Sequence, residues 1–443
     1  LWRQYEIGEV NIFENKFLDE FKVAQENLRL FRQANPNCGR TGSPACNFGN
    51  TGLGGQRDIP VIRTAIGLTD TTTLASLDRG EAGRVAASIA QNLTRMNALI
   101  SARLVPFVTM PDPNNPGQTI TLSNFFVANP RSPTSSWLMD NAGDSNYHAL
   151  QVELRRRFSG GLLAQGNYTF AKSLTNSFSN SAAGGLTPTT LRNFDYDKAI
   201  APRDNRHAFK IDYIYELPFG PGKAWLSSKN ALVSRLVGGW QVGGVTRIQS
   251  GTASLLLSGA TAATNRQTYN NRESGVVLHN ITRDQLQKQV KIRKETVCNA
   301  QGRCQGIVYW LPQSIIDNTL AAFEVGGKSL TDLDRGKPYI GPPTTPGELG
   351  ARVFLYGPWT SRFDINLLKQ VRITEQRNFE LRVQFLNAFN QSAIVIRDVD
   401  NNADSFGITN TFGQTRNAFR DFTVSGTNDP GGRLIEFQLR LNF

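Results

Sequence analysis

The most regular pattern in the chain lies at its C-terminal end, from Arg433 to Phe443. Apolar and polar residues alternate there without a break. The apolar positions are Ile435, Phe437, Leu439, Leu441 and Phe443, and the polar ones are Glu436, Gln438, Arg440 and Asn442. Successive side chains of a β-strand point to opposite faces. The segment is therefore predicted to be a strand with one wholly apolar face and one hydrated face.

The same alternation recurs upstream, with apolar residues on one face and mostly charged or amide side chains on the other. The apolar residues are Leu150, Val152, Leu154 and Phe158, then Leu162, Ala164, Tyr168 and Phe170, then Phe209, Ile211, Tyr213, Tyr215 and Leu217, then Trp240, Val242 and Ile248, then Phe363, Ile365, Leu367, Val371 and Ile373, and then Phe379, Leu381, Val383 and Phe385. The turns Ser159-Gly160 and Thr374 to Arg377 predict two hairpins. With Leu1 to Asn11 as a weaker candidate, the chain has about eight strands, several longer than the roughly five to six residues usual in soluble sheets.

A soluble β-sandwich also has alternating strands, so alternation alone does not decide the fold. Three features favour a transmembrane β-barrel. Aromatic residues such as Tyr168, Tyr213 and Trp240 lie near the ends of the apolar faces, as in the aromatic girdles of membrane barrels. Charged residues follow the polar faces over their whole length, which suits a wet lumen. Short and long connections also alternate along the chain.

The order of these connections gives the strongest support. The short ones are 159–160, 218–239 and 374–377, and the long ones are 174–205, 251–360 and 390–432. If Phe443 lies on the periplasmic side, every short connection falls inside and every long loop outside, as in barrels of the bacterial outer membrane. We therefore expect an all-β fold, an antiparallel transmembrane β-barrel with long, partly helical extracellular loops. The strands of this chain alone are compatible with an open sheet or with a small barrel.

Three loop segments have helical periodicity. They are Glu14 to Gln33, Glu81 to Arg103 and the basic stretch Thr282 to Lys294. We expect them to pack against one another above the barrel; the functional alternative is a cap that grips a ligand or a surface that binds a partner. Stretches rich in Pro and Gly, at Pro106 to Gly117 and Gly336 to Gly350, are predicted to be loop linkers.

Four cysteines form two local pairs in the predicted outer loops, Cys38 with Cys46 and Cys298 with Cys304. Local disulfides in an oxidising compartment are the expected interpretation. A zinc site is the alternative, but the spacings lack the C-x2-4-C form of zinc knuckles.

Composition is consistent with crossing a membrane by strands. The mean hydropathy is -0.33, and no run approaches the ~18 apolar residues of a membrane helix. The formal net charge is +12, but the basic residues are spread singly, which argues against a nucleic-acid partner. The arginines predicted to face the lumen are Arg155, Arg157, Arg247, Arg372, Arg382 and Arg440. We expect these charges to pair with neighbouring carboxylates; a lumen biased towards anionic solutes is the alternative.

Catalytic chemistry has little support in the sequence. The three histidines, His148, His207 and His279, are not in a ligand spacing, and no nucleophile elbow, P-loop or dinucleotide fingerprint is present. We therefore expect no enzymatic activity, no catalytic residue, no metal and no cofactor.

Several segments, in this order, resemble TonB-dependent outer-membrane receptors, in particular the Oar-like, carboxypeptidase-regulatory-domain type. These segments are SNYHALQVELRRRFSGGLLAQGNYTFAKSL (Ser145 to Leu174), RHAFKIDYIYELPFGPGK (Arg206 to Lys223), GGWQVGGVTRIQSG (Gly238 to Gly251), RFDINLLKQVRI with FELRVQFLNAFN (Arg362 to Asn390), and the closing FQLRLNF; EIGEVNIFENKFLDEF (Glu6 to Phe21) and YWLPQSIIDNTLAAF (Tyr309 to Phe323) are similar to loops of the same group. The resemblance covers most of the chain.

The resemblance implies energised uptake. Such receptors form 22-stranded barrels, closed by an N-terminal plug, and a periplasmic TonB box couples plug movement to the inner-membrane proton gradient. The plug, the TonB box, the regulatory domain, a signal peptide and the early strands are all missing here. Residues 1–443 are therefore expected to be the C-terminal barrel portion of a longer precursor, and no TonB-contacting residue carries over.

Within this family, the terminal residues Phe437, Leu439, Leu441 and Phe443 resemble the signal read by the barrel-assembly machinery. The expected function is active transport of an unknown ligand, which the outer loops bind and the barrel passes with TonB-derived energy. The expected partners are outer-membrane lipid, the barrel-assembly machinery and, through the missing N-terminal part, the TonB complex. A structural or adhesion protein without transport and a passive porin are the alternatives.

Overall fold

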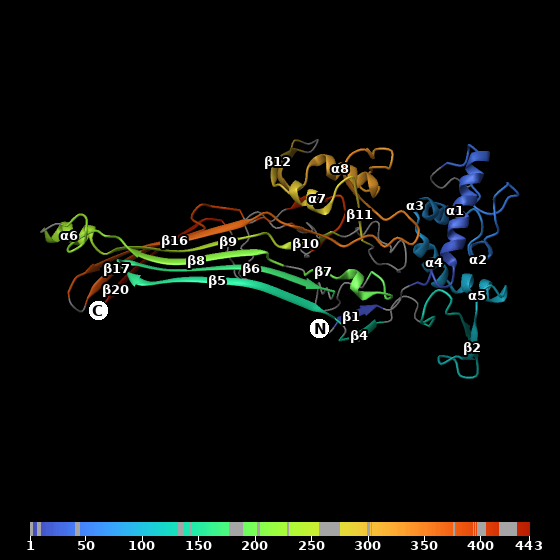
Figure 1. Ribbon diagram of the computed structural model, residues 1–443, viewed down its shortest axis with the longest axis horizontal. Helices are drawn as coiled ribbons and strands as arrows, with labels where there is room; N and C mark the ends of the chain where they lie inside the picture. The colour runs from blue at the N-terminus through green and yellow to red at the C-terminus, as the bar shows by residue number, and fades with distance from the viewer. Residues whose placement is uncertain are drawn as a thin grey trace.

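The computed structural model contains one large antiparallel sheet (Figure 1). It describes residues 3–6, 10–39, 45–131, 137–141, 143–176, 189–201, 204–227, 230–256, 275–298, 302, 304–374, 377–392, 394, 396, 405–415 and 432–443. The sheet order is β20-β17-β16-β9-β8-β6-β5, and the short β7 also pairs with β6. The strands are β5 Ser145–Ser159, β6 Leu162–Thr175, β7 Ala199–Ile200, β8 His207–Glu216, β9 Trp240–Gln249, β16 Thr360–Arg372, β17 Asn378–Leu386 and β20 Leu434–Asn442.

The strand register confirms the two faces that the alternation predicts. Residues directly opposite each other on paired strands lie on the same face. Apolar residues meet apolar residues, as in Leu150 with Phe170 and Leu381 with Leu439. Polar residues do the same; Glu380, for example, lies opposite Arg440. One face of the sheet is therefore apolar across its strands, and the opposite face carries most of the charge.

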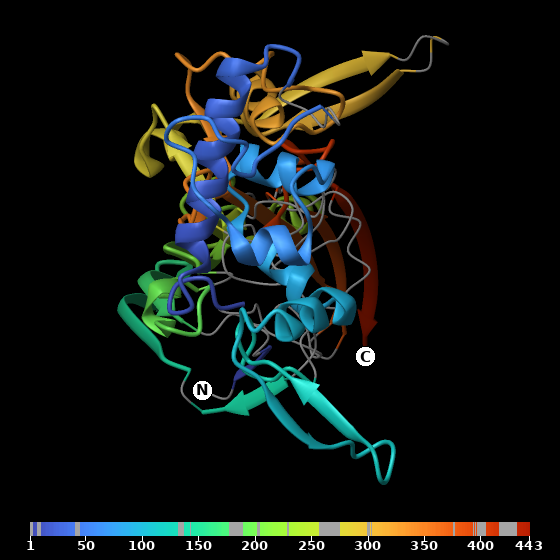
Figure 2. The same cartoon turned by 90° about the vertical axis from the view of Figure 1, so that its right-hand side faces the viewer.

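The sheet is open. Its two edge strands, β5 and β20, are not paired with each other. Viewed from the loop end, the strands form an arc that leaves one side unclosed (Figure 2). Of the two forms compatible with the sequence, the structure has the open sheet, and the arc has the curvature of a barrel wall.

The two ends of the sheet differ as the connection lengths predict. The C-terminus and the short connections, one of which contains the helix α6 Ala231–Val237, lie at one end, and the long loops with the other helices lie at the other (Figure 1). The first turn is shifted by one residue from its predicted place: Ser159 is still in β5, and the turn is Gly160-Gly161. Both glycines have positive φ, 61° and 82°, which a tight hairpin turn requires and Ser159 would adopt less readily.

The long loops fold into two compact regions with separate cores. The first contains the helices α1 Phe17–Ala34, α2 Pro60–Ala65, α3 Thr71–Arg79, α4 Ala82–Ala90 and α5 Leu93–Ser101. Its core includes Phe17, Phe21, Ile62 and Ile89, all almost fully buried. Each such side chain contributes on the order of 1.5–3 kcal/mol of burial free energy. The helix predicted over Glu81 to Arg103 is two helices, because Asn92 interrupts the first and caps α5 by accepting from the Arg95 N–H.

The second region, built around α7 Arg283–Gln289 and α8 Gln313–Ala322, buries Trp310, Ile340 and Leu355. Its strands are β10 Ala253–Leu256, β11 Val277–His279, β12 Arg293–Cys298, β13 Cys304–Tyr309, β14 Tyr339–Gly341, β15 Val353–Tyr356, β18 Ser405–Phe406 and β19 Gln414–Thr415. The predicted helix Thr282 to Lys294 is shorter than expected, because the chain joins β12 at Arg293 to pair with β13. It also packs in this second core, so the prediction that the three helical segments pack together is wrong for this one.

Two further predictions need correction. Arg3–Glu6 forms a strand, β1, but it pairs with β4 Trp137–Asp140 and not with the large sheet. The linker predicted at Pro106 to Gly117 contains β2 Val108–Pro111, which pairs with β3 Thr119–Leu122, and the other predicted linker contains β14. In both segments the many glycines and prolines predict loops, and the short strands among them were missed. No helix of the described residues has the length and apolar content needed to span a bilayer.

The structure joins both predicted cysteine pairs as disulfides. Cys46 is fully buried in the first core, and the Cys298–Cys304 bridge links the ends of β12 and β13. All four cysteines are therefore oxidised, and free-thiol labelling of the unreduced, unfolded protein should modify none of them. Labelling of two or more thiols would contradict the pairing.

The two faces of the sheet predict opposite responses to added charge. Val383→Arg should lower the free energy of unfolding in lipid vesicles by roughly 2–4 kcal/mol if the apolar face contacts lipid near the midplane. Gln384→Arg should have a mild effect, because Gln384 lies on the polar face opposite Glu436. Phe437→Arg and Gln438→Arg form a second matched pair. Urea unfolding of each variant gives the comparison, and equal effects within a pair would show that the faces are misassigned.

Candidate functional site

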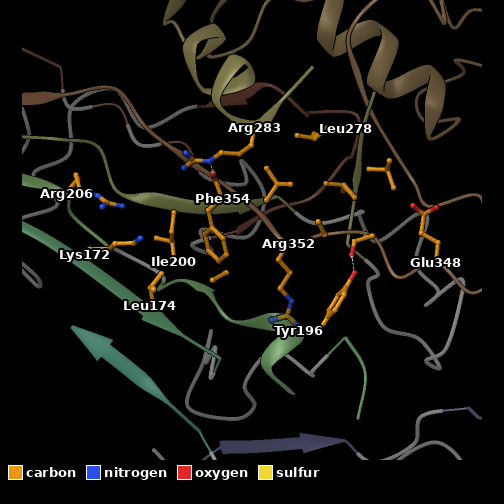
Figure 3. Close-up of a pocket in the computed structure, with 16 residues that line it drawn as sticks. Lys172, Leu174, Tyr196, Ile200, Arg206, Leu278, Arg283, Glu348, Arg352 and Phe354 are labelled. Carbon is orange, nitrogen blue, oxygen red and sulfur yellow. Dashed lines mark hydrogen bonds between the residues drawn. The ribbon is translucent and has the colours of Figure 1, made fainter. Parts of the chain in front are cut away.

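The described residues form a cleft of about 740 Å³ where the loop end of the sheet meets the second core (Figure 3). This size is within the range of small-molecule sites. The lining residues come from β6, η1 Phe194–Asp197, β7, β11, α7 and β15, together with the segments that flank them. Five charged side chains line it: Lys172, Arg206, Arg283, Arg352 and Glu348. Four of these five charges are positive, so the charged part of the lining is mainly basic.

A buried ion pair fixes one wall of the cleft. The Arg352 Nε lies 2.9 Å from a carboxylate oxygen of Asp197, whose side chain is 1% exposed. Asp197 also accepts a hydrogen bond from the Thr189 N–H at 2.6 Å. Next to it, the Tyr196 hydroxyl donates to the Gly350 carbonyl. These contacts hold the 3₁₀ turn of η1 against the strand that begins at Val353.

A second carboxylate positions Arg206. The Tyr356 hydroxyl donates to Asp204 at 2.7 Å, and Arg206 donates to the same hydroxyl at 2.9 Å. Asp204 also accepts from the Ser173 N–H at 2.7 Å, which ties it to the end of β6. Burial raises the pKa of Tyr356, and the Asp204 carboxylate raises it further, so the phenol stays protonated as a donor. Arg206 is thus held by the protein and is not available as a free cation.

Arg283 and Lys172 have more donor capacity left. Arg283 donates to the Phe354 carbonyl at 3.2 Å and to Asp284 at 3.0 Å, but its buried Nη2 has no hydrogen-bond partner among the described residues. A buried donor without a partner is unfavourable, and an anion or a water would relieve that cost. Lys172 is exposed at the rim, close to the apolar side chains of Ile200 and Phe354 (Figure 3).

This arrangement suits a ligand with an anionic group and an apolar body. Arg283 supplies directed N–H donors, which match a carboxylate or a phosphate. Leu174, Ile200, Val353 and Phe354 supply the apolar lining. Among the described residues, no group of three or more His, Cys, Asp and Glu is placed to hold a metal ion.

One comparison with known proteins covers most of the chain. A family model described as an outer membrane beta barrel domain matches residues 84–423, which is most of the chain. The chain belongs to the outer-membrane β-barrel family. It is therefore a protein of the bacterial outer membrane, and its large antiparallel sheet is barrel wall. No curated protein sequence matches the chain.

In this outer-membrane barrel protein, the predicted lumen arginines lie apart from the cleft. The register places Arg155, Arg247, Arg372, Arg382 and Arg440 on the polar face of the wall. Arg157 falls in a register irregularity of β5, so pairing does not fix its face. The Arg382 guanidinium lies 3.2 Å from Glu380, as expected for a paired lumen charge. That the polar face lines a lumen, and that the other arginines are paired, stay predictions.

The predicted assembly residues and the histidines are spread over several elements. Phe437, Leu439 and Leu441 lie exposed on the apolar face of β20, and Phe443 follows it at the C-terminus, so the assembly signal stays a prediction. His207 stacks against Trp359 at the loop end of the wall, and His279 stacks on Tyr339 in the second core. Burial lowers the pKa of His279.

None of the cleft residues was among the predicted site residues. They come from chain segments that only the folded loops bring together. One signal was present in the sequence: Arg352 directly precedes the apolar run Val353 to Tyr356, and a charge at the edge of a buried strand requires a partner. The sequence did not show that the partner would be Asp197.

The buried Asp197–Arg352 pair predicts a strong mutational effect on the cleft. Asp197→Asn should destabilise this region by on the order of 3–5 kcal/mol, because it leaves a buried guanidinium without its carboxylate. Hydrogen exchange of residues 189–200 and 350–356 in the intact protein measures the effect. The control is Asp58→Asn, whose ion pair with Arg63 is exposed and should contribute little. Unchanged protection in Asp197→Asn would contradict the structural role of this pair.

Proposed function

We propose that this protein is an active transporter of the outer membrane, a TonB-dependent receptor of the Oar-like type. The observation that carries the proposal is the basic cleft among the outer loops, at the end of a wall with a charged inner face. A ligand with an anionic group binds there, with Arg283 and Lys172 as its charged contacts, and then passes through the barrel. No catalytic step, metal, cofactor or nucleic acid is part of this function.

The loops support ligand capture because they are folded. Two buried cores hold their elements, and the disulfide Cys38–Cys46 is part of the first. The cleft therefore has a fixed shape before a ligand arrives, and such preorganisation lowers the entropic cost of binding. A passive porin has no need for a folded external cap with a site of this kind. The energy for transport comes from the TonB complex, acting through an N-terminal part of the longer protein.

An adhesion or structural role is the second candidate. The hairpins β2–β3 and β12–β13 project away from the rest of the molecule (Figure 2), and the disulfide Cys298–Cys304 braces one of them. Projecting braced hairpins are suited to contact another surface. This candidate involves no transport and no coupling to the inner membrane.

Two measurements on the full-length protein separate these functions. The first is binding of the purified periplasmic domain of TonB, and the second is ion conductance across a planar lipid bilayer. The transporter should bind the TonB domain and show no steady conductance, because a plug closes the barrel. A variant that lacks the TonB box is the control, and it should lose TonB binding.

Steady conductance of the full-length protein without TonB binding would overturn the proposal in favour of a porin. If the full-length protein shows no conductance and does not bind TonB, the proposal is overturned in favour of the adhesion role. Each result is independent of the ligand, which is not needed in either assay.

A further inference from the structure

The connection 218–239 at the end opposite the loops exposes an unusual amount of apolar surface. It contains α6 Ala231–Val237, seen at the far left of Figure 1. Five of its apolar side chains are strongly exposed: Trp225, Leu226, Leu232, Val233 and Leu236. Leu232 and Leu236 are each 72% exposed. In a hairpin connection surrounded by water, this surface would be unfavourable.

The helix is amphipathic. Leu232, Val233 and Leu236 occupy one side, since residues three and four apart share a helix face. Ser234 lies on the opposite side. The helix begins at Asn230, whose side chain accepts from the Leu232 N–H at 2.9 Å. The Gly238 N–H bonds back to Ser234 at 3.0 Å and ends it. These two hydrogen bonds define the ends of a short helix. Its apolar side chains face away from the rest of the protein.

Two side chains of the wall hold the end of this helix. The Lys369 ammonium donates to the carbonyls of Arg235 at 2.7 Å, Leu236 at 2.9 Å and Gly238. The Trp240 indole N–H donates to the same Leu236 carbonyl at 3.1 Å. The last carbonyls of a helix have no partner within it, and they carry its negative dipole end. Lys369 therefore donates hydrogen bonds to the last carbonyls of α6, and its positive charge offsets the negative end of the helix dipole.

The position of Lys369 shows on which side of the wall α6 lies. Lys369 alternates with Ile365, Leu367 and Val371, so it occupies the apolar face of β16. Its partner across the strands is Trp240, and its ammonium lies 5.1 Å from that ring. A lysine among apolar residues is costly unless its charge is satisfied. The carbonyl oxygens at the end of α6 accept the hydrogen bonds of the ammonium. The helix is therefore held on the side of the apolar face of the wall and not on the side of the polar face.

We propose that α6 and the preceding Trp225–Leu226 form an anchor that lies in the periplasmic leaflet of the outer membrane. The occupant of the exposed apolar surface is phospholipid: its acyl chains contact Leu232, Val233 and Leu236, and its headgroups contact Arg235. The place of the helix selects lipid over a protein partner, because its end is bonded to Trp240 and Lys369 on the apolar face of the wall. Tryptophan and amphipathic helices are both favoured at the boundary of headgroups and acyl chains.

Spin-label accessibility on the intact protein tests the anchor. Because the native cysteines are paired, Leu236→Cys and Ser234→Cys each introduce one free thiol, on opposite sides of the same helix. The protein is placed at one copy per nanodisc of phosphatidylethanolamine and phosphatidylglycerol. The label at position 236 should collide with oxygen at least several-fold more, relative to a water-soluble nickel chelate, than the label at 234.

The competing occupants give different results. Equal nickel accessibility at both positions would overturn the proposal, since it would place the helix in water. Protection of position 236 only when discs hold two copies would also overturn it and would assign the surface to a second copy. Disc preparations contain no periplasmic protein, so protection at one copy per disc comes from lipid.

The Lys369 contact has its own test. Lys369→Met removes the ammonium but keeps an apolar side chain on an apolar face, so the wall should still assemble. With its C-terminus released, α6 should become more mobile, and the ratio of oxygen to nickel collisions at position 236 should fall towards that at 234. Lys210→Met is the control, because Lys210 lies on the polar face near Asp212. An unchanged signal in Lys369→Met would show that this contact does not position the helix.

Discussion

The structure depends on one constraint of the bilayer: in hydrocarbon, every backbone N–H and C=O must find a partner within the protein. The strands between the edge strands β5 and β20 satisfy it by pairing with a neighbour on each side. Their side chains then fall on two faces, whether or not the sequence suits this. Here the sequence does suit it. Because a slip of one residue would exchange the faces, the alternation also fixes the register. The pairs Val383–Phe437 and Leu381–Leu439 show this match between neighbouring strands.

Outside the membrane the chain follows different rules. Water competes for polar groups there, so the long loops gain stability only by burying apolar residues, as any soluble domain does. Two cores result, and an ion pair between Arg79 and Glu324 joins them. The basic cleft forms where the second core meets the end of the wall. Two of its arginines, Arg352 and Arg206, are placed by the buried carboxylates of Asp197 and Asp204. The site therefore depends on the packing of the loops.

The wall could be predicted from the sequence because period-two alternation is a local signal, repeated over long strands. The loop elements were harder. The basic segment after Thr282 has helical spacing, but its last two residues, Arg293 and Lys294, pair with β13, a contact no local pattern reveals. The cleft was missed for the same reason: Lys172, Arg283 and Arg352 come from separate segments. Lys369 was a visible exception, a single lysine in an apolar row, and the structure shows that its ammonium holds the C-terminal end of α6.

The central claim is that lipid contacts the apolar face of the sheet. A photo-activatable amino acid placed at Leu381 or at Arg382, neighbours on opposite faces of β17, tests this in native outer membranes. Mass spectrometry of the irradiated protein should find lipid adducts at position 381 and none at 382. Adducts at 381 to protein alone, with no lipid attached, would show that these side chains form a protein interior, and the account of the wall would be wrong.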